Sequence, residues 1–306
     1  MARYLVLRLG QALLVLFGIT LVAFVITFLV PADPARMIAG QSATAETVQR
    51  IRHELGLDLP LPAQFGRYLR HVLRGDLGRS YAQKVDVAAL LRSRFPATVE
   101  LMVAGIVFEL LIGLPAGILA AVRRDSWLDR TVMVGAFLGV SAPQFAVGLL
   151  LLYLVAFKLQ VLPLGGYGGL SHVLLPALTL GIAGGGWYAR VMRSAMVEVL
   201  TQDYVRTARA KGLPGVQVVS KHALKNAILP VVTMVGLDFG TFMGGVVVVE
   251  SVFGWPGIGQ LAWQAIQIVD IPVIMGVVIF SALAIVTGNL LADLVYPLLD
   301  PKIRYQ

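Results

Sequence analysis

The chain has 306 residues, of which 58% are hydrophobic and 14% charged, and its mean hydropathy is +0.81. This composition lies outside the range of soluble globular proteins and indicates a membrane protein. The formal net charge of +8 is therefore interpreted by its location along the chain and not as a sign of nucleic-acid binding, and the lack of cysteine excludes disulfides and thiolate metal sites.

Six apolar segments are long enough to cross a bilayer core of about 30 Å, because a helix rises about 1.5 Å per residue. The first could pass for a secretory signal. It is longer than the apolar core of such a signal and lacks a small-residue cleavage site, so we expect it to be retained. The segments predict an all-α integral membrane protein with six transmembrane helices. They comprise residues 9–30, 97–122, 131–157, 173–189, 227–249 and 272–295.

A long polar region, residues 31–96, separates the first two predicted spans. Apolar residues recur at helical spacing within 42–56 and 65–75, and a glycine ends each run, so we expect two short amphipathic helices there. The region is interpreted either as a cap on the ends of the spans or as a docking surface for an external partner.

A third short helix is expected through Val87, Leu90 and Leu91, ending at Pro96, which suits the first turn of the second span. The chain is accordingly divided into two parts. Residues 1–96 hold the first span and the polar helical region, and residues 97–306 hold a core of five spans.

Lysine and arginine concentrate in residues 123–130, in residues 190–226 and at the end of the chain. Cytoplasmic connections of membrane proteins carry an excess of these residues, so both termini are predicted to be cytoplasmic. Alternation then places residues 31–96 outside in spite of their arginines, because a connection of that length is translocated regardless of its charge.

The stretch QDYVRTARAKGLPG, residues 202–215, predicts a short helix in the longest cytoplasmic connection. Asp203 in the first turn and Lys211 in the last suit the helix dipole, and Gly212 suits a left-handed stop. Tyr204 and Ala208 lie four residues apart and share a face that a partner protein could approach. From the residues alone, an equal alternative is a basic amphipathic segment on anionic lipid head groups.

The order of several motifs resembles the permease subunits of ABC importers of the dipeptide, oligopeptide and nickel class. The motifs are DYVRTARAKGL, KHALKNAILPVV and GGVVVVESVFGWPGIGQL, together with DPARMIAG and GDLGRSY in the region before the second span and LDPKIRY at the chain end. The resemblance covers nearly the whole chain. It implies the type I permease fold with a small extracytoplasmic helical region between helices 1 and 2, in a bacterial or archaeal cytoplasmic membrane.

The resemblance also implies that the connection 190–226 carries a coupling helix, the so-called EAA motif, which docks into an ATPase subunit. Aligned on Gly212, the Glu-Ala-Ala of that motif falls on residues 206–208, and only its second alanine and the glycine match. We expect the ATPase-coupling residues to be Asp203, Tyr204, Arg206, Thr207, Ala208, Lys211 and Gly212.

No G-x-x-x-x-G-K-[ST] phosphate loop occurs in the chain, so ATP hydrolysis is expected elsewhere. The resemblance implies a second homologous permease, two ABC ATPase subunits that hold ATP and Mg²⁺, and an extracytoplasmic substrate-binding protein. The chain itself is expected to be a membrane-embedded permease that is not an enzyme and holds no cofactor.

Glu109 and Asp238 are the acidic residues placed deepest in predicted spans, where a charge costs about 2.5–3.5 kcal/mol on insertion scales. They are interpreted either as an internal hydrogen bond or ion pair between helices or as part of the translocation path. Trp255 suits the interfacial aromatic belt, and Pro256 and Gly257 force a turn; the resemblance makes these three an outer gate segment. Glu250, near a span end, is expected at the membrane interface.

Histidines and methionines show no ligand spacing, so no metal site is predicted, and short peptides, including glutathione, are favoured over nickel as the substrate. An ion-coupled secondary transporter using Glu109 and Asp238 is the rival from another class. It leaves the capped cytoplasmic helix unexplained. An intramembrane hydrolase is disfavoured because no histidine lies in a predicted span.

Overall fold

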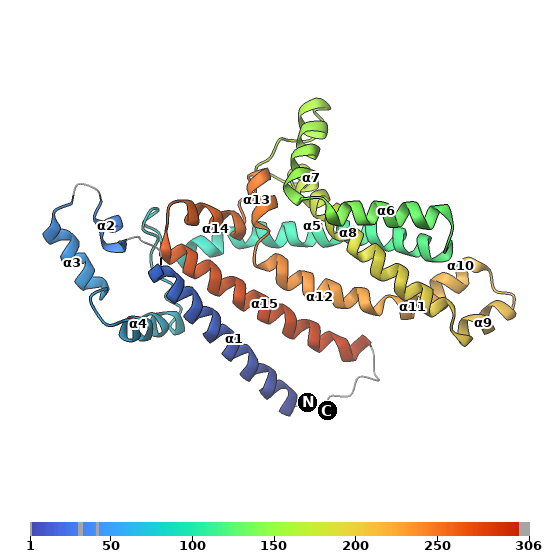
Figure 1. Cartoon of the computed structure of the whole chain (residues 1–306), viewed down its shortest axis with the longest axis horizontal. Helices are drawn as coiled ribbons and strands as arrows, with labels where there is room; N and C mark the ends of the chain where they lie inside the picture. Colours follow the sequence, from blue (N-terminus) through green and yellow to red (C-terminus); the bar gives the residue numbers. More distant parts are fainter. Residues whose placement is uncertain (1, 30–32, 41–42, 300–306) are drawn as a thin grey trace.

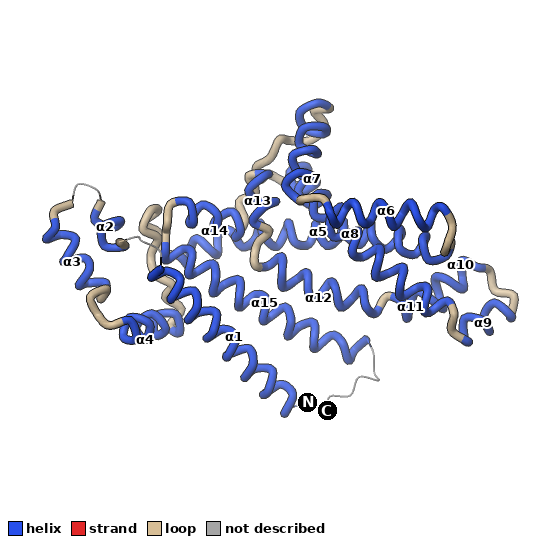
Figure 2. The backbone as a smooth tube through the Cα atoms, in the orientation of Figure 1, coloured by secondary structure: helices blue, strands red, loops and turns tan. Residues whose placement is uncertain are grey.

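The computed structural model describes residues 2–29, 33–40 and 43–299, and this part of the chain is built from helices joined by short connections (Figures 1 and 2). The helices follow in the order α1 Ala2–Leu29, α2 Pro34–Ala39, α3 Ala45–Leu55, α4 Leu61–Leu73, α5 Val87–Val122, α6 Trp127–Ser141, α7 Gln144–Leu151, η1 Leu152–Lys158, α8 Leu170–Leu200, α9 Asp203–Ala210, α10 Gly215–Gln217, η2 Val218–Ala223, α11 Leu224–Ala227, α12 Leu229–Met243, α13 Val247–Phe253, α14 Ile258–Gln267 and α15 Ile271–Leu299. Here η1 and η2 are π-helical.

Four of the described helices, α1, α5, α8 and α15, are each long and apolar enough to cross a membrane. Two further spans exist only if bent pairs are counted as one span each: α6 with α7 and η1, bent by 101°, and α10–α11 with α12, bent by 49°. The predicted count of six spans is thus reached only if both bent pairs are counted as spans, and the number of crossings is four to six.

The predicted span 131–157 breaks between α6 and α7. Ala142 has extended backbone angles (φ −72°, ψ 130°) because the ring of Pro143 disfavours a helical conformation in the residue before it. In Figure 1, α7 turns away from the long axis of the bundle that α6 follows.

The predicted span 227–249 also ends early. Helix α12 stops at Met243, Gly245 has φ +93°, and residues 247–253 form the separate helix α13. At the other end, the 49° bend falls at Ile228, next to Pro230, which confirms the kink predicted from that proline.

Helix α5 is longer than predicted. It begins at Val87 and runs through Pro96, so the third short helix expected before the second span is part of that span's helix. Val87 and Leu91 are buried against Ile258 of α14 and Val273 of α15, and this packing stabilises the part of the helix that precedes the predicted span. The division of the chain after residue 96 stays a prediction, with its boundary inside α5.

The centre of the fold is the contact between α5 and α8, which has the most extensive packing of any helix pair in the described chain. Glycines allow it: a Cβ at Gly117 of α5 would collide with the backbone of Ala189 and Arg193, and a Cβ at Gly181 of α8 would collide with Phe108 of α5. The small residues of 181–190 thus serve the close helix approach that membrane packing needs.

The polar region forms helices α2, α3 and α4 at one end of the molecule (Figure 1). The two predicted amphipathic helices are confirmed as α3, capped by Thr44 and the left-handed Gly56, and α4. Helix α2, begun by Asp33 and a proline, was not predicted.

The loop after α4 is anchored by Asp270, which lies directly before α15. Its buried carboxylate accepts hydrogen bonds from Ser80 Oγ (2.5 Å), Tyr81 N (3.1 Å) and Ala82 N (3.2 Å). Burial, and then the nearby charge of Asp270, raise the pKa of Tyr81 to about 12. The sequence signal for this anchor is an Asp followed two residues later by Pro272, which is typical of a helix start.

Candidate coupling helix and membrane interior

Helix α9, Asp203–Ala210, lies at the opposite end of the molecule from α2–α4 (Figure 1). Gln202 enters it with an extended backbone, Asp203 occupies its first turn and Arg209 its last. Gly212 follows with φ +78°, a left-handed conformation that favours glycine. The short helix and its glycine stop are therefore confirmed, although the preceding residues 190–200 belong to α8 and are not a loop.

One face of α9 is packed against its own chain. Val205 and Ala208 (5% exposed) form a small apolar cluster with Val218 of η2. The prediction that Tyr204 and Ala208 share an open face is thus wrong for Ala208, because that side chain is covered by η2.

Tyr204 is 42% exposed, and its hydroxyl accepts a hydrogen bond of 2.7 Å from Nδ2 of Asn226 on α11. Since α11 leads through the bend at Ile228 into α12, this bond ties α9 to a helix that enters the membrane part of the fold. A displacement of α9 therefore has a direct mechanical route to α12.

The other face of α9 is open. It carries Asp203, Arg206, Thr207 and Lys211, all exposed, with Gly212 beside them. The only ion pair that the structure gives these residues, among those described, is a loose contact of 3.6 Å between Arg206 and Asp203. Exposed pairs of this kind contribute little stability, so these charges remain accessible to a partner.

The structure brings Glu109 of α5 and Asp238 of α12 together, with their carboxyl groups in electrostatic contact. Tyr188 of α8 donates a hydrogen bond to Asp238 Oδ2. Glu109 is 3% exposed and its carboxylate lies against Gly184, where a Cβ would collide with it. The Tyr188–Asp238 hydrogen bond joins α8 to α12, as expected of an internal hydrogen bond, whereas Glu109 Oε2 is buried without a hydrogen-bond partner among the described residues. A role of Glu109 or Asp238 in the translocation path stays a prediction.

Trp255 is fully buried, so its predicted place in an interfacial belt is wrong. Its indole N–H donates to the carbonyl of Ala97 on α5 (2.8 Å), and its ring meets Tyr167 edge-on at 4.9 Å between centroids. Pro256 and Gly257 make the turn into α14, as predicted. The segment is therefore wedged between α5 and the loop that precedes α8.

Glu250 was expected at the interface but is 0% exposed. Its Oε2 accepts from the backbone N–H of Gln260 (2.8 Å) and its Oε1 from Thr98 Oγ1 (3.3 Å). The interface prediction is wrong because the carboxylate satisfies N–H groups at the start of α14. The available sequence signal was the pair Gly257 and Gly259, whose missing side chains leave room for it.

An ion pair that the sequence did not reveal joins α6 to α8. Asp129 Oδ1 and Oδ2 lie 2.6 Å from Arg193 Nε and Nη2, and Asp129 is buried. The partners are far apart in the chain, so no local pattern connects them. The pair holds the first turn of α6 against the C-terminal third of α8.

Comparison with known proteins agrees with this architecture. Residues 113–305 match the family described as binding-protein-dependent transport system inner membrane component, and residues 1–102 match the N-terminal model of such membrane components. The chain belongs to this family.

Two curated relatives extend the match over the full length of both chains. The glutathione transport system permease protein GsiC of Salmonella paratyphi A is 43% identical over 306 residues, and that of Escherichia coli strain K12 is 42% identical. Among solved structures, an inward-facing MetNI methionine ABC transporter matches with TM-score 0.60 and 21% identity, over 69% of this chain and 96% of that one. An amino acid ABC transporter matches with TM-score 0.51 and 16% identity, over 68% and 93%.

These findings confirm the ABC importer permease fold and a multi-pass protein of the inner membrane. A binding-protein-dependent importer of this family works with ATPase and substrate-binding partners. The chain is thus a transport subunit.

Proposed function

We propose that this chain, together with a second related permease, forms the membrane path of an ABC importer for short peptides, with glutathione as the leading substrate. The observation that carries the proposal is full-length identity of 42–43% to glutathione permeases. The match covers the whole of both chains, so it is not confined to one part of the permease.

In this proposal, two ATPase subunits bind ATP and Mg²⁺ and contact the exposed face of α9. The chain itself holds no cofactor. The residues that act in coupling are Asp203, Tyr204, Arg206, Thr207, Lys211 and Gly212, and Ala208 supports α9 from beneath. Closure of the ATPases on ATP moves α9, and the bond from Asn226 to Tyr204 passes the movement to α11 and α12.

The orientation follows from the same assignment. If α9 faces the ATPases, it lies in the cytoplasm, and α2–α4 at the other end of the molecule lie outside, near the substrate-binding protein. Both termini are then cytoplasmic, in agreement with the concentration of lysine and arginine in residues 190–226. Trp255, Pro256 and Gly257 lie on the outer side, where they shape the gate.

Reconstitution tests the proposal. The permease is assembled with its partner permease, ATPases and binding protein in proteoliposomes, and ATP hydrolysis and uptake are measured with binding protein loaded with glutathione, a dipeptide or nickel. We expect stimulation by glutathione and weaker stimulation by the dipeptide. Stimulation by nickel alone, or uptake driven by an ion gradient without ATP, contradicts the proposal.

A further inference from the structure

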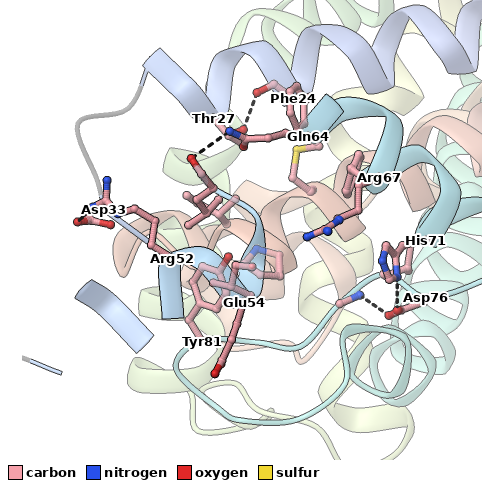
Figure 3. Close-up of a pocket in the computed structure, with 18 residues that line it drawn as sticks. Phe24, Thr27, Asp33, Arg52, Glu54, Gln64, Arg67, His71, Asp76 and Tyr81 are labelled. Atoms are coloured by element: carbon pink, nitrogen blue, oxygen red, sulfur yellow. Dashed lines mark hydrogen bonds and ion pairs between the residues drawn. The ribbon is translucent and has the colours of Figure 1, made fainter. Parts of the chain in front are cut away.

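A cavity of about 1050 Å³ lies at the end of the molecule that carries α2–α4 (Figure 3). Its walls come from the end of α1, from α3 and α4, from the loop after α4 and from the first turn of α15. Two of these helices, α1 and α15, are long and apolar enough to cross a membrane, whereas α3 and α4 belong to the polar region, so the cavity joins an apolar part of the molecule to a polar one.

The cavity is amphipathic. On the side of the two spans its lining is mostly apolar and includes Phe24 and Met275, with Thr27 as its polar member. On the side of α3 and α4 it carries charged side chains. A lining of this kind suits an amphiphile whose polar part faces α3 and α4 and whose apolar part faces the spans.

Four of the polar side chains in the lining contact one another in two pairs. Arg52 pairs with Asp33 (2.5 Å), and His71 pairs with Asp76 (2.8 Å). Among the described residues, neither Arg67 nor Glu54 has an oppositely charged partner within ion-pair distance, although both line the cavity.

The position of Arg67 is set by a glycine. Its guanidinium group lies against Gly56, where a Cβ would collide with it, and Gly56 has φ +68°. Figure 3 shows the guanidinium group directed into the cavity and not toward Asp76. Guanidinium groups recognise phosphate oxygens through paired hydrogen bonds.

Helix α1 has little other packing. Only 6% of its apolar window is buried, and its most extensive contact with another described helix is with α15. Near the cavity, Phe24 packs on Phe65 of α4 at 5.2 Å between ring centroids. The lipid-facing flank of α1 thus continues into the cavity.

We propose that the cavity holds one zwitterionic phospholipid, with its phosphate on Arg67, its ammonium group at Glu54 and its acyl chains against Phe24 and Met275. Arg67 and Glu54, a cation and an anion without an ion-pair partner in the described part of the chain, match a head group that carries both charges. The lipid joins α1 to α3 and α4. This site is independent of the transported substrate.

Native mass spectrometry of the assembled transporter, released from nanodiscs of equal parts phosphatidylethanolamine and phosphatidylglycerol, tests the proposal. We expect one retained phosphatidylethanolamine. Arg67→Ala lowers its occupancy about tenfold, as for the loss of a charge-assisted contact. Arg67→Lys restores part of it, and Glu54→Gln lowers the preference for phosphatidylethanolamine.

The matched control is Arg70→Ala, on the same helix and exposed but outside the cavity lining, which leaves lipid retention unchanged. Size-exclusion profiles show whether each variant assembles. Equal retention in the Arg67→Ala and Arg70→Ala proteins, or no retained lipid in the wild type, overturns the proposal. So does displacement of the lipid by added peptide substrate, because the cavity is then a substrate site.

Discussion

The Asp129–Arg193 pair shows how much a single buried contact contributes in this fold. The carboxylate is buried and accepts two hydrogen bonds from one guanidinium group, while the backbone N–H of Asp125 adds a third (3.0 Å). An ion that is buried with its partner becomes costly when the partner is removed. The pair therefore stabilises the contact between α6 and α8.

Replacing Asp129 by asparagine is expected to destabilise the protein by about 3 kcal/mol, because Arg193 loses its counter-charge in a partly buried position. Thermal unfolding in detergent measures the effect. Asp125→Asn is the control, since Asp125 and its partner Arg124 are exposed, and it should leave the unfolding temperature nearly unchanged. Equal decreases in the unfolding temperature of the two variants would show that the Asp129–Arg193 pair does not contribute more stability than an exposed ion pair.

At the scale of elements, α9 combines a rigid inner face with an open outer one. Its stop at Gly212 and its bond to Asn226 determine how movement of the helix reaches α12. Changes at these two points should affect coupling more than stability, because both lie on the surface.

Gly212→Ala is expected to cost about 1 kcal/mol locally, since a side chain disfavours φ +78°. Because this cost loosens the end of α9, ATP hydrolysis should become less coupled to uptake. Gly215→Ala is the control: neither glycine has a neighbour within 4 Å of an added Cβ, and only Gly212 has positive φ. A ratio of peptide imported per ATP that is unchanged in Gly212→Ala would contradict the expected role of the stop.

Tyr204→Phe removes the hydroxyl that accepts from Asn226, a net loss of about 1 kcal/mol for this bond. We expect the ratio of uptake to hydrolysis to fall while the transporter still assembles. Ser220→Ala on η2 serves for comparison, because that hydroxyl bonds only to Val216 within its own helical segment. If both variants transport equally well, α9 does not act through α11.

For the whole molecule, the α5–α8 contact is the axis on which the other helices are arranged. Its closeness depends on glycines of both helices. In a bilayer the approach of backbones replaces the hydrophobic effect as the source of helix association, so added side-chain volume at this contact affects the entire fold.

Gly117→Ala is expected to destabilise the protein by about 1–3 kcal/mol, the range for overpacking, since its Cβ would meet the backbone of Ala189 and Arg193 on α8. Gly135→Ala on α6, which has nothing within 4 Å, should have little effect or a slight stabilising one. Thermal unfolding of both proteins in one detergent provides the test. A smaller loss of stability in Gly117→Ala than in Gly135→Ala would contradict the close packing of α5 against α8.

The membrane class, the approximate positions of the spans, the amphipathic helices α3 and α4 and the capped helix α9 could all be predicted from the sequence. Each depends on residues close together in the chain: apolar runs, helical spacing, and a glycine or acid at a helix end. The kink beside Pro230 is of the same kind, because the missing N–H acts within one turn.

Only the tertiary structure decided which polar groups meet. Asp129 pairs with Arg193, and Asp238 accepts a hydrogen bond from Tyr188. Glu250 is buried and accepts a hydrogen bond at the start of α14 instead of facing the interface. Tertiary packing also buries Ala208 and Trp255, and it allows α5 to continue through Pro96. In each case the energy comes from partners distant in sequence, and a one-dimensional pattern carries no information on which distant partner removes a group from water or lipid.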